Sequence, residues 1–422
     1  MVLDTEQANK LENLTLEQQL DLQNLHFLDE GAYGCVYKKT DAGQKKTKSI
    51  VKIQKLTPEA KREDEIGKLI RKIPKYFLYF APVIKTKTIS IGEVNDSEIK
   101  KCTIITNEQD IKQKYVTNRI KYAGEHSLGE YILMTLEKNP KHFLRTFFVS
   151  YFDMLYTMSL LNKNGIIHFD LKQNNVMYNK SHDRPVAIDF GMSLIKSMLV
   201  PANYSEFFFS YGYDYPPWCF EISIISYAVQ EFGSSIDKEV LTMEQVDKLC
   251  NNFTDINPVF FNDGETGHHD IFTKEERTTY NTKLKEYLKP LLGNTWSVVI
   301  QANLGFIDTW DIYAVHVLFL LLLYHIHIYE YNTDEFPVIK TFIDKLKREI
   351  MAVPNERKPY EAIFGELMAD FNQSNRTNLN TILTSISVAA NDEAKIADVK
   401  QKLNKLKLRE LKKEKQFYNK IQ

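Results

Sequence analysis

Three polar side chains follow one another at short intervals in the segment IIHFDLKQNNVMYN, which runs from residue 166 to residue 179. Asp170 carries a carboxylate that can accept a proton from a hydroxyl group. Lys172 carries an ammonium group that can neutralise a phosphoryl group, and Asn175 carries an amide oxygen that Mg²⁺ can bind. Apolar runs on both sides predict short strands, with a loop between them that can bring the three side chains together. An ordinary polar hairpin loop is the alternative for this segment taken alone.

Other segments carry residues suited to holding a phosphorylated ligand and a metal ion. Asp189 lies in AIDFG between apolar residues and a glycine, and a buried carboxylate is costly unless it is paired or binds a metal. Gly31 and Gly34 flank Tyr33 in LDEGAYGCV, and glycines allow a backbone to approach phosphates closely, although most such turns are only turns. Lys52 is a lone cation in the apolar segment SIVKI, where it either extends its ammonium to solvent or holds a phosphate.

In this order along the chain, these segments resemble the motifs of the eukaryotic-type protein kinases. The resemblance covers most of residues 25–370. It implies a transferase that uses ATP and Mg²⁺ to phosphorylate hydroxyls of protein substrates. Asp170 corresponds to the catalytic base and Lys172 to the lysine on the γ-phosphate, a residue that favours Ser and Thr over Tyr acceptors. Asn175 and Asp189 correspond to the metal ligands.

The resemblance also implies a nucleotide site. The segment from Leu28 to Val36 corresponds to the glycine-rich loop. The segment LMTLE resembles the hinge, with Met134 as gatekeeper and with Thr135 and Leu136 offering backbone groups to adenine.

A glutamate on the following helix should pair with Lys52. Glu63 and Glu65 are both candidates for this partner. Glu63 is favoured because Ile66 and Ile70 follow it at helical spacing. The residues expected to bind the nucleotide are Leu28, Gly31, Tyr33, Gly34, Val36, Ile50, Lys52, Glu63, Met134, Leu136 and Met177.

Later segments extend the resemblance toward the C-terminus. PPWCFE resembles the end of the activation segment, with Glu221 as its acidic residue, and Arg357 in PNERKP is its expected partner. DIYAV resembles the start of the central helix, with Asp311 binding the backbone of the catalytic loop.

Several positions depart from the family pattern. Asp29 replaces the first glycine of the loop, Ile50 replaces the usual alanine, and roughly ninety residues separate Glu221 from Asp311. HFDLKQNNVMY, IPKYFLYFAP and that insertion resemble the divergent kinases of large cytoplasmic DNA viruses. Phe169 replaces an arginine that would pair with a phosphate on the activation segment, so we expect aromatic packing to order that segment.

The distribution of patterns predicts an α+β chain of two lobes, because strand-like runs come first and helical patterns dominate afterwards. The resemblance implies that this bilobal fold is kinase-like. We expect a polar arm over 1–24, a β-rich lobe with one helix over 25–137, and a helical lobe over 138–375. Glu130 to Glu137 reads as a strand, and 226–304 reads as an insertion with a weak core pattern. The extension over 376–422 contains a predicted basic amphipathic helix from about Ala394 to Gln422, which is either a solvated face packed on the large lobe or a contact to an anionic surface.

Composition limits the alternatives. The chain has 422 residues, a net charge of -1, 43% hydrophobic residues and 26% charged residues, which is ordinary for a soluble globular protein and gives no general case for nucleic-acid binding. Its four cysteines are far apart and form no CxxC pair, which argues against a disulfide framework or a zinc site and fits a reducing compartment. We therefore expect a cytoplasmic protein, with the virion as a second location if it is viral.

The apolar run from Ala314 to Tyr329 reads as a buried core helix, so no membrane span is expected.

Two alternative functions stay open. One is a small-molecule kinase of the aminoglycoside or choline type, against which Lys172, PPWCFE and Arg357 argue. The other is a pseudokinase or virion scaffold, which need not keep Lys52, Asp170, Asn175 and Asp189 together.

Overall fold

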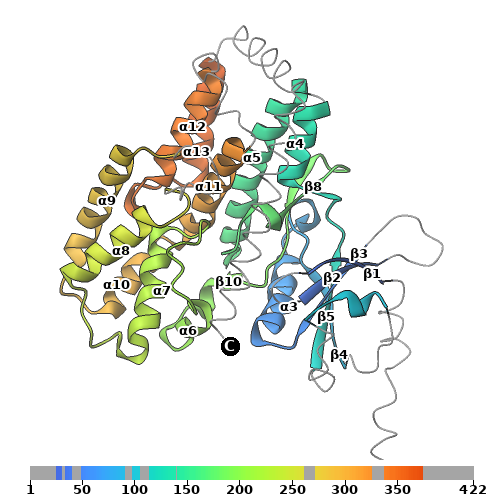
Figure 1. The fold of residues 1–422 in the computed structure, drawn as a ribbon, viewed down its shortest axis with the longest axis horizontal. Coiled ribbons are helices and arrows are strands. Elements are labelled where there is room, and N and C mark those ends of the chain that lie inside the picture. The colour runs from blue at the N-terminus through green and yellow to red at the C-terminus, as the bar shows by residue number, and fades with distance from the viewer. Residues whose placement is uncertain are drawn as a thin grey trace, which may run out of the picture. The chain divides into compact units, whose positions relative to one another are not determined.

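A computed structural model of the chain describes residues 25–30, 34–39, 49–90, 97–104, 114–138, 140–260, 271–325 and 337–373. These residues form two compact units (Figure 1). The first unit contains the described residues up to Ala123 together with Ile188–Gly191, and the second contains the described residues of Gly124–Ala187 and those from Met192 onward. The first is rich in strands and the second is mostly helical, which confirms the predicted α+β class.

A five-stranded antiparallel sheet forms the frame of the first unit, in the order β1-β2-β3-β5-β4. The strands are β1 (Leu25–Glu30), β2 (Gly34–Lys39), β3 (Ser49–Lys55), β4 (Val83–Ser90) and β5 (Lys114–Lys121). The predicted pairing of the strands around the lysine-rich segment is confirmed, because β2 and β3 are antiparallel neighbours with Val36 opposite Lys52.

The predicted helix after β3 is also confirmed, as α3 (Pro58–Ile70). The side chain of Thr57 accepts a hydrogen bond from the backbone of Ala60 and caps its first turn. Gly67 lets the helix approach β4 closely, because a Cβ there would lie 2.6 Å from the carbonyl oxygen of Val83. The sequence of α3 therefore places the helix against the sheet.

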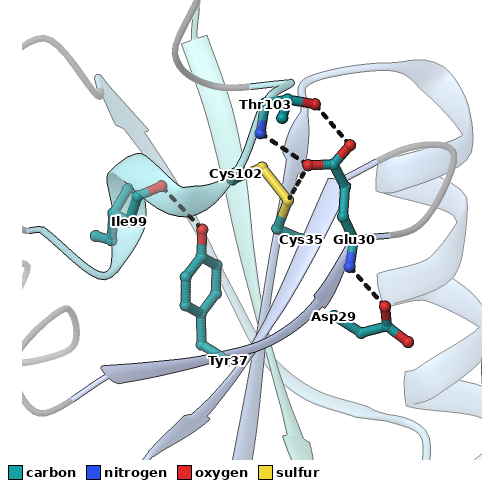
Figure 2. The surroundings of a disulfide bond; sticks show 7 residues. All are labelled: Asp29, Glu30, Cys35, Tyr37, Ile99, Cys102 and Thr103. Carbon is teal, nitrogen blue, oxygen red and sulfur yellow. Dashed lines mark hydrogen bonds between the residues drawn. A yellow bond between two sulfur atoms is a disulfide. The ribbon is translucent and has the colours of Figure 1, made fainter.

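Cys35 on β2 forms a disulfide with Cys102, a single cross-link that the prediction of no disulfide framework did not include. Cys102 caps the short helix η3 (Ile99–Lys101), and the two cysteines are 67 positions apart, too far for any local sequence pattern to reveal the pairing. Figure 2 shows the bond beside Tyr37, whose hydroxyl donates to the carbonyl of Ile99 at 3.2 Å. The other two cysteines, Cys219 and Cys250, are free and buried.

Packed helices dominate the second unit. They are α4 (Leu128–Lys138), α5 (Pro140–Lys163), α6 (Tyr204–Phe207), α7 (Phe220–Phe232), α8 (Met243–Asp255), α9 (Lys274–Leu288), α10 (Trp296–Leu304), α11 (Trp310–His325), α12 (Pro337–Ile350) and α13 (Tyr360–Gln373). Helix α5 packs on α4, α11 and α13, and α11 also packs on α12 (Figure 1).

Small sheets complete the second unit. One has the strand order β6-β8-β9 and the other pairs β10 with β7. Their strands are β6 (His126–Ser127), β7 (Ile166–Ile167), β8 (Val176–Asn179), β9 (Arg184–Ala187) and β10 (Leu194–Ile195). The loop that carries Asp170 thus lies between β7 and β8, as its apolar flanks predict.

The predicted strand from Glu130 to Glu137 is wrong, because these residues lie in α4. A short apolar run fits a buried strand or a buried helix equally well, and here Ile132 and Leu136 are buried at helical spacing. Ser127 and Glu130 form a reciprocal capping box, with hydrogen bonds of 2.9 and 3.3 Å, that starts the helix. Helix α4 belongs to the second unit, which begins at Gly124.

The segment from 226 to 304 has a stronger core than its sequence suggests. Phe253, Tyr280 and Trp296 are fully buried within it. Capping boxes begin both α8 and α9, where Thr242 pairs with Gln245 and Thr273 pairs with Glu276. The aromatic residues that form this core are spaced too widely to give a periodic pattern in the sequence.

Among the described residues, the stretch Ile307–Tyr324 is long and apolar enough to cross a membrane. Within the protein, 72% of that stretch is buried, as in the core helix of a folded domain. The predicted N-terminal arm (1–24), Gly31, Tyr33 and the extension over 376–422 lie outside the described residues.

Candidate active site

The first unit holds a buried group of charges around Lys52. The ammonium Nζ of Lys52 lies 3.0 Å from Oδ1 of Asp189 and 3.6 Å from Oε2 of Glu63. Glu63 also accepts hydrogen bonds of 3.0 Å from the side-chain amides of Gln54 and Asn118. Glu63, rather than the exposed Glu65, is thus the glutamate beside Lys52.

The charge state of this group follows from burial and pairing. Burial alone lowers the pKa of Lys52, but the carboxylates of Asp189 and Glu63 outweigh it and raise the pKa above its usual value. Burial raises the pKa of Glu63, and the Lys52 ammonium and the two amide donors oppose that rise. Lys52 is therefore a cation at neutral pH, fixed between two acidic side chains.

Local backbone geometry directs Asp189 toward Lys52. Asp189 has φ of 60°, in the left-handed region that Asp tolerates better than most residues. Its Oδ1 accepts a 3.3 Å hydrogen bond from the backbone of Gly191, and the buried Phe190 packs edge-on against Phe80. The DFG motif thus fixes the direction of one carboxylate.

A second polar group surrounds Asp170 in the second unit. Oδ2 of Asp170 accepts a 2.9 Å hydrogen bond from the amide of Asn175, which also binds the Asp170 carbonyl at 2.8 Å. Nζ of Lys172 lies 3.2 Å from Oδ1 of Asp170. Tyr215 donates a hydrogen bond to the same Oδ1 and accepts one of 3.2 Å from Lys172. The three residues predicted from the loop therefore meet at one buried carboxylate, together with a tyrosine that sequence reasoning missed.

The backbone of this loop is held by Asp311 at the start of α11. Its carboxylate accepts hydrogen bonds from the backbone of His168 at 2.7 Å and of Phe169 at 3.0 Å, the contact that the resemblance implies. Burial raises the pKa of Asp311, opposed by His168 and by these hydrogen bonds. Ser193 adds a 3.0 Å hydrogen bond to the carbonyl of His168. The loop is thus fixed from both sides.

Phe169 packs in an aromatic cluster, as its sequence context predicts. Its ring centroid lies 4.8 Å from that of Trp218, 6.0 Å from that of Phe208 and 6.2 Å from that of Trp310. Phe169 has φ of 67°, and its carbonyl accepts a 2.9 Å hydrogen bond from the indole of Trp218. The segment before α7 is therefore joined to the Asp170 loop by rings and one hydrogen bond.

Glu221 and Arg357 form the ion pair expected between the activation segment and a late element. Both side chains are buried and in direct contact. Arg357 also donates a 3.1 Å hydrogen bond to Thr309 and lies 5.5 Å from the ring centroid of Tyr313. This pair links the start of α7 to the residues that precede α13.

Other predicted nucleotide residues lie on strands. Leu28 is exposed on β1, Val36 and Ile50 are half-buried on β2 and β3, and Met177 is half-buried on β8 of the second unit. Gly34 has a structural reason to be glycine, since a Cβ there would lie 2.1 Å from the carbonyl oxygen of Ile53.

The assignments of Met134 and Leu136 to an adenine-binding hinge are contradicted. Both residues lie within helix α4, where backbone amides and carbonyls bond within the helix and do not line an extended hinge. The physical cause is the capping box of Ser127 and Glu130, which commits the apolar run to a helix.

With a five-stranded antiparallel sheet in one unit and packed helices in the other, the chain resembles the protein kinase-like superfamily. No protein-family model matches the chain.

Particular relatives are distant. Cyclin-dependent kinase G1 of Arabidopsis thaliana is 25% identical over 178 residues, 41% of this chain, and the match spans 25% of the length of that protein. The solved structure of the Cydia pomonella granulovirus kinase PK-1 is 16% identical, with a TM-score of 0.33, and the match covers 71% of this chain and 98% of that one.

Proposed function

We propose that this protein is an ATP- and Mg²⁺-dependent kinase that transfers the γ-phosphoryl group to Ser and Thr hydroxyls of protein substrates. The observation that carries the proposal is the meeting of Asp170, Lys172 and Asn175 at one buried carboxylate on a loop fixed by Asp311. A polar hairpin with no chemical role would not need to bury an acid, a cation and an amide together.

In the proposed reaction, Asp170 orients the acceptor hydroxyl and takes its proton as the oxygen attacks the γ-phosphorus. Lys172 offsets the negative charge that develops on the transferred group. These residues position and stabilise the reactants, because phosphoryl transfer leaves little covalent chemistry to the protein.

Each unit, taken by itself, offers groups suited to a nucleotide and its metal. Asp189 offers a carboxylate and Asn175 an amide oxygen, the hard oxygen ligands that Mg²⁺ prefers, and the side chain of Asp189 keeps 39% of its surface exposed. Lys52 is held as a cation suited to the α- and β-phosphates. Bound Mg²⁺ would supply charge neutralisation on the phosphate oxygens.

The decisive test replaces the proposed base. Asp170→Asn keeps an oxygen for Tyr215 and Lys172 but cannot take a proton at neutral pH. Turnover should fall by about two orders of magnitude or more, while MgATP affinity measured by isothermal titration changes little. Asp189→Asn should instead weaken binding of MgATP.

Asp214→Asn is the matched control, because Asp214 is exposed on the same segment as Tyr215. It should leave both measurements unchanged. Native turnover in Asp170→Asn would refute the assignment of the base. Candidate acceptors can also be tested in a panel with radiolabelled ATP. If small molecules were phosphorylated and proteins were not, the assignment of proteins as substrates would be refuted.

A further inference from the structure

Tyr215 brings a hydroxyl group to the proposed base from a different part of the chain. It lies between the DFG motif and α7, 45 positions after Asp170. Its phenol donates to Oδ1 of Asp170 and accepts a 3.2 Å hydrogen bond from Nζ of Lys172. A phosphoryl acceptor needs this arrangement, because its hydroxyl must lie within hydrogen-bond reach of the base.

Several contacts hold Tyr215 in this position. Its backbone nitrogen donates to the carbonyl of Gly212 at 3.1 Å, and its carbonyl accepts from Trp218 at 3.0 Å. Its ring stands edge-on to Trp218 at 5.3 Å, and the Lys172 ammonium lies 5.7 Å from the ring centroid. The phenol is thus part of the ordered aromatic segment and remains half-buried, so the side chain has a route outward.

We propose that Tyr215 is a specificity-determining residue that covers the acceptor position and excludes water from Asp170 until a protein hydroxyl displaces it. This inference rests on the proposed function. Asp170 is buried, with 6% of its surface exposed, and its Oδ1 is shared between the phenol and Lys172. A water molecule bound to Oδ1 at the position of the phenol hydroxyl would have to displace Tyr215.

The reaction that Tyr215 suppresses is hydrolysis of ATP. A water oxygen would form a bond to the γ-phosphorus as the bond from that phosphorus to the β–γ bridging oxygen breaks. Asp170 would take one water proton, ADP would leave with the bonding electron pair, and inorganic phosphate would be released. A protein hydroxyl competes for the same oxygen of Asp170 but brings the binding energy of its polypeptide, which can offset the displacement of one phenol.

Tyr215→Phe removes one oxygen atom and keeps the ring that contacts Trp218. In this variant Asp170 and Lys172 each lose the hydrogen bond that they make to the phenol oxygen. A water molecule in place of the missing hydroxyl can restore both hydrogen bonds. Acceptor-free ATP hydrolysis should rise by about tenfold or more, since water then lies on a positioned base. The KM for a protein acceptor should fall, and the KM for ATP should stay unchanged.

Tyr213→Phe is the matched control, because it removes a hydroxyl two positions away that is not bound to Asp170. The double variant Asp170→Asn/Tyr215→Phe should lose the gain in hydrolysis. Melting temperatures establish that each variant is folded.

The outcomes separate this inference from the proposed function. If the native protein phosphorylates acceptors and Tyr215→Phe hydrolyses ATP no faster, the inference fails alone. Phosphate found on Tyr215 by mass spectrometry would show an internal acceptor and overturn it as well. If neither protein consumes MgATP, the proposed function fails and the inference fails with it. Faster hydrolysis in Tyr215→Phe that depends on Asp170 supports both.

Discussion

The charged groups of the two units are held in place by different means. In the first unit, Lys52 lies between two carboxylates, and Glu63 is fixed by amides from Gln54 on β3 and Asn118 on β5. Lys52 and Asn118 are direct partners in the register of the two strands, so a regular sheet sets the spacing. The single ammonium there lies between two acidic side chains.

In the second unit, Asp170 lies on an irregular loop that no strand register positions. Its place depends on Asp311, which holds the backbone, and on Phe169 and Trp218, which join the loop to the aromatic segment. The difference teaches that strand register sets the spacing of Lys52 and Asn118 in the first unit, whereas contacts from distant residues hold the Asp170 loop in the second. The two units also use different cross-links, a disulfide in the first and a buried ion pair in the second.

The largest expected effect comes from breaking the ion pair of the second unit. Arg357→Ala leaves the Glu221 carboxylate buried without its cation, which costs about 3–5 kcal/mol of the free energy of unfolding. Chemical denaturation should show this loss as a lower midpoint.

The double variant Glu221→Gln/Arg357→Met is the control, because it removes both charges together. It should be more stable than Arg357→Ala, since neither side chain is left as an unpaired buried charge. Equal stability of Arg357→Ala and the native protein would show that packing alone holds these elements together.

Removing the disulfide should have the next largest effect. Cys35→Ala/Cys102→Ala opens a long covalent loop, which costs about 2–5 kcal/mol. Hydrogen exchange should accelerate in β1, β2 and η3, whereas α11 of the second unit should keep its protection. Cys250→Ala, which removes a buried free thiol, is the control. If hydrogen exchange accelerated equally in both units, the disulfide would not be a cross-link that stabilises the first unit selectively.

A smaller, pH-dependent effect is expected at His316 in the second unit. Burial, assisted by Arg357, lowers the pKa of His316 from 6.5 to about 3, and a ring nitrogen bonds the Tyr151 hydroxyl at 2.9 Å. The unfolded chain therefore binds a proton below about pH 6.5 that the folded protein does not. This contribution to stability is complete above pH 6.5 and falls by about 1.4 kcal/mol per pH unit as the pH decreases toward 3.

Denaturation of His316→Gln beside the native protein isolates this contribution. Between about pH 7 and about pH 5 the native protein should lose about 2 kcal/mol more than the variant. His126→Gln, at a half-buried position, is the control. Parallel curves for the native protein and His316→Gln would show that the imidazole is not kept neutral by burial.

The smallest effect is expected when phosphate is removed from the protein, a treatment that tests whether aromatic packing orders the segment before α7. Because Phe169 contacts Trp218 and Phe208 where an arginine would bind a phosphate, phosphatase treatment should change turnover little. Ser205→Ala/Ser210→Ala should likewise retain activity. A large loss in either experiment would mean that a phosphate orders the segment.

The sequence predicted much of the first unit, because its signals are local. Strand patterns around the lysine-rich segment and the proline that opens α3 gave the right elements. The three residues at Asp170 could also be grouped by their spacing alone. Cys35 and Cys102 could not be paired, because only the folded sheet brings them together.

The second unit was harder to predict because distant contacts decide its local structure. The run from Glu130 to Glu137 became a helix, and only the capping box of Ser127 and Glu130 could have indicated this. Tyr215 is one of several aromatic residues in its segment, and nothing in the pattern separates it from Tyr211 or Tyr213. Its role depends on a contact made across 45 positions.

The disulfide also imposes an order of events on the making of this protein. Cys35 leaves the ribosome 67 residues before Cys102, and both sulfur atoms end up fully buried. An oxidant must therefore reach the two thiols before the sheet packs over them, or during a later opening of the sheet. Whether the finished protein carries the Cys35–Cys102 disulfide therefore depends on whether an oxidant was present while it folded. Recombinant preparations should be compared by thiol titration before their activities are compared.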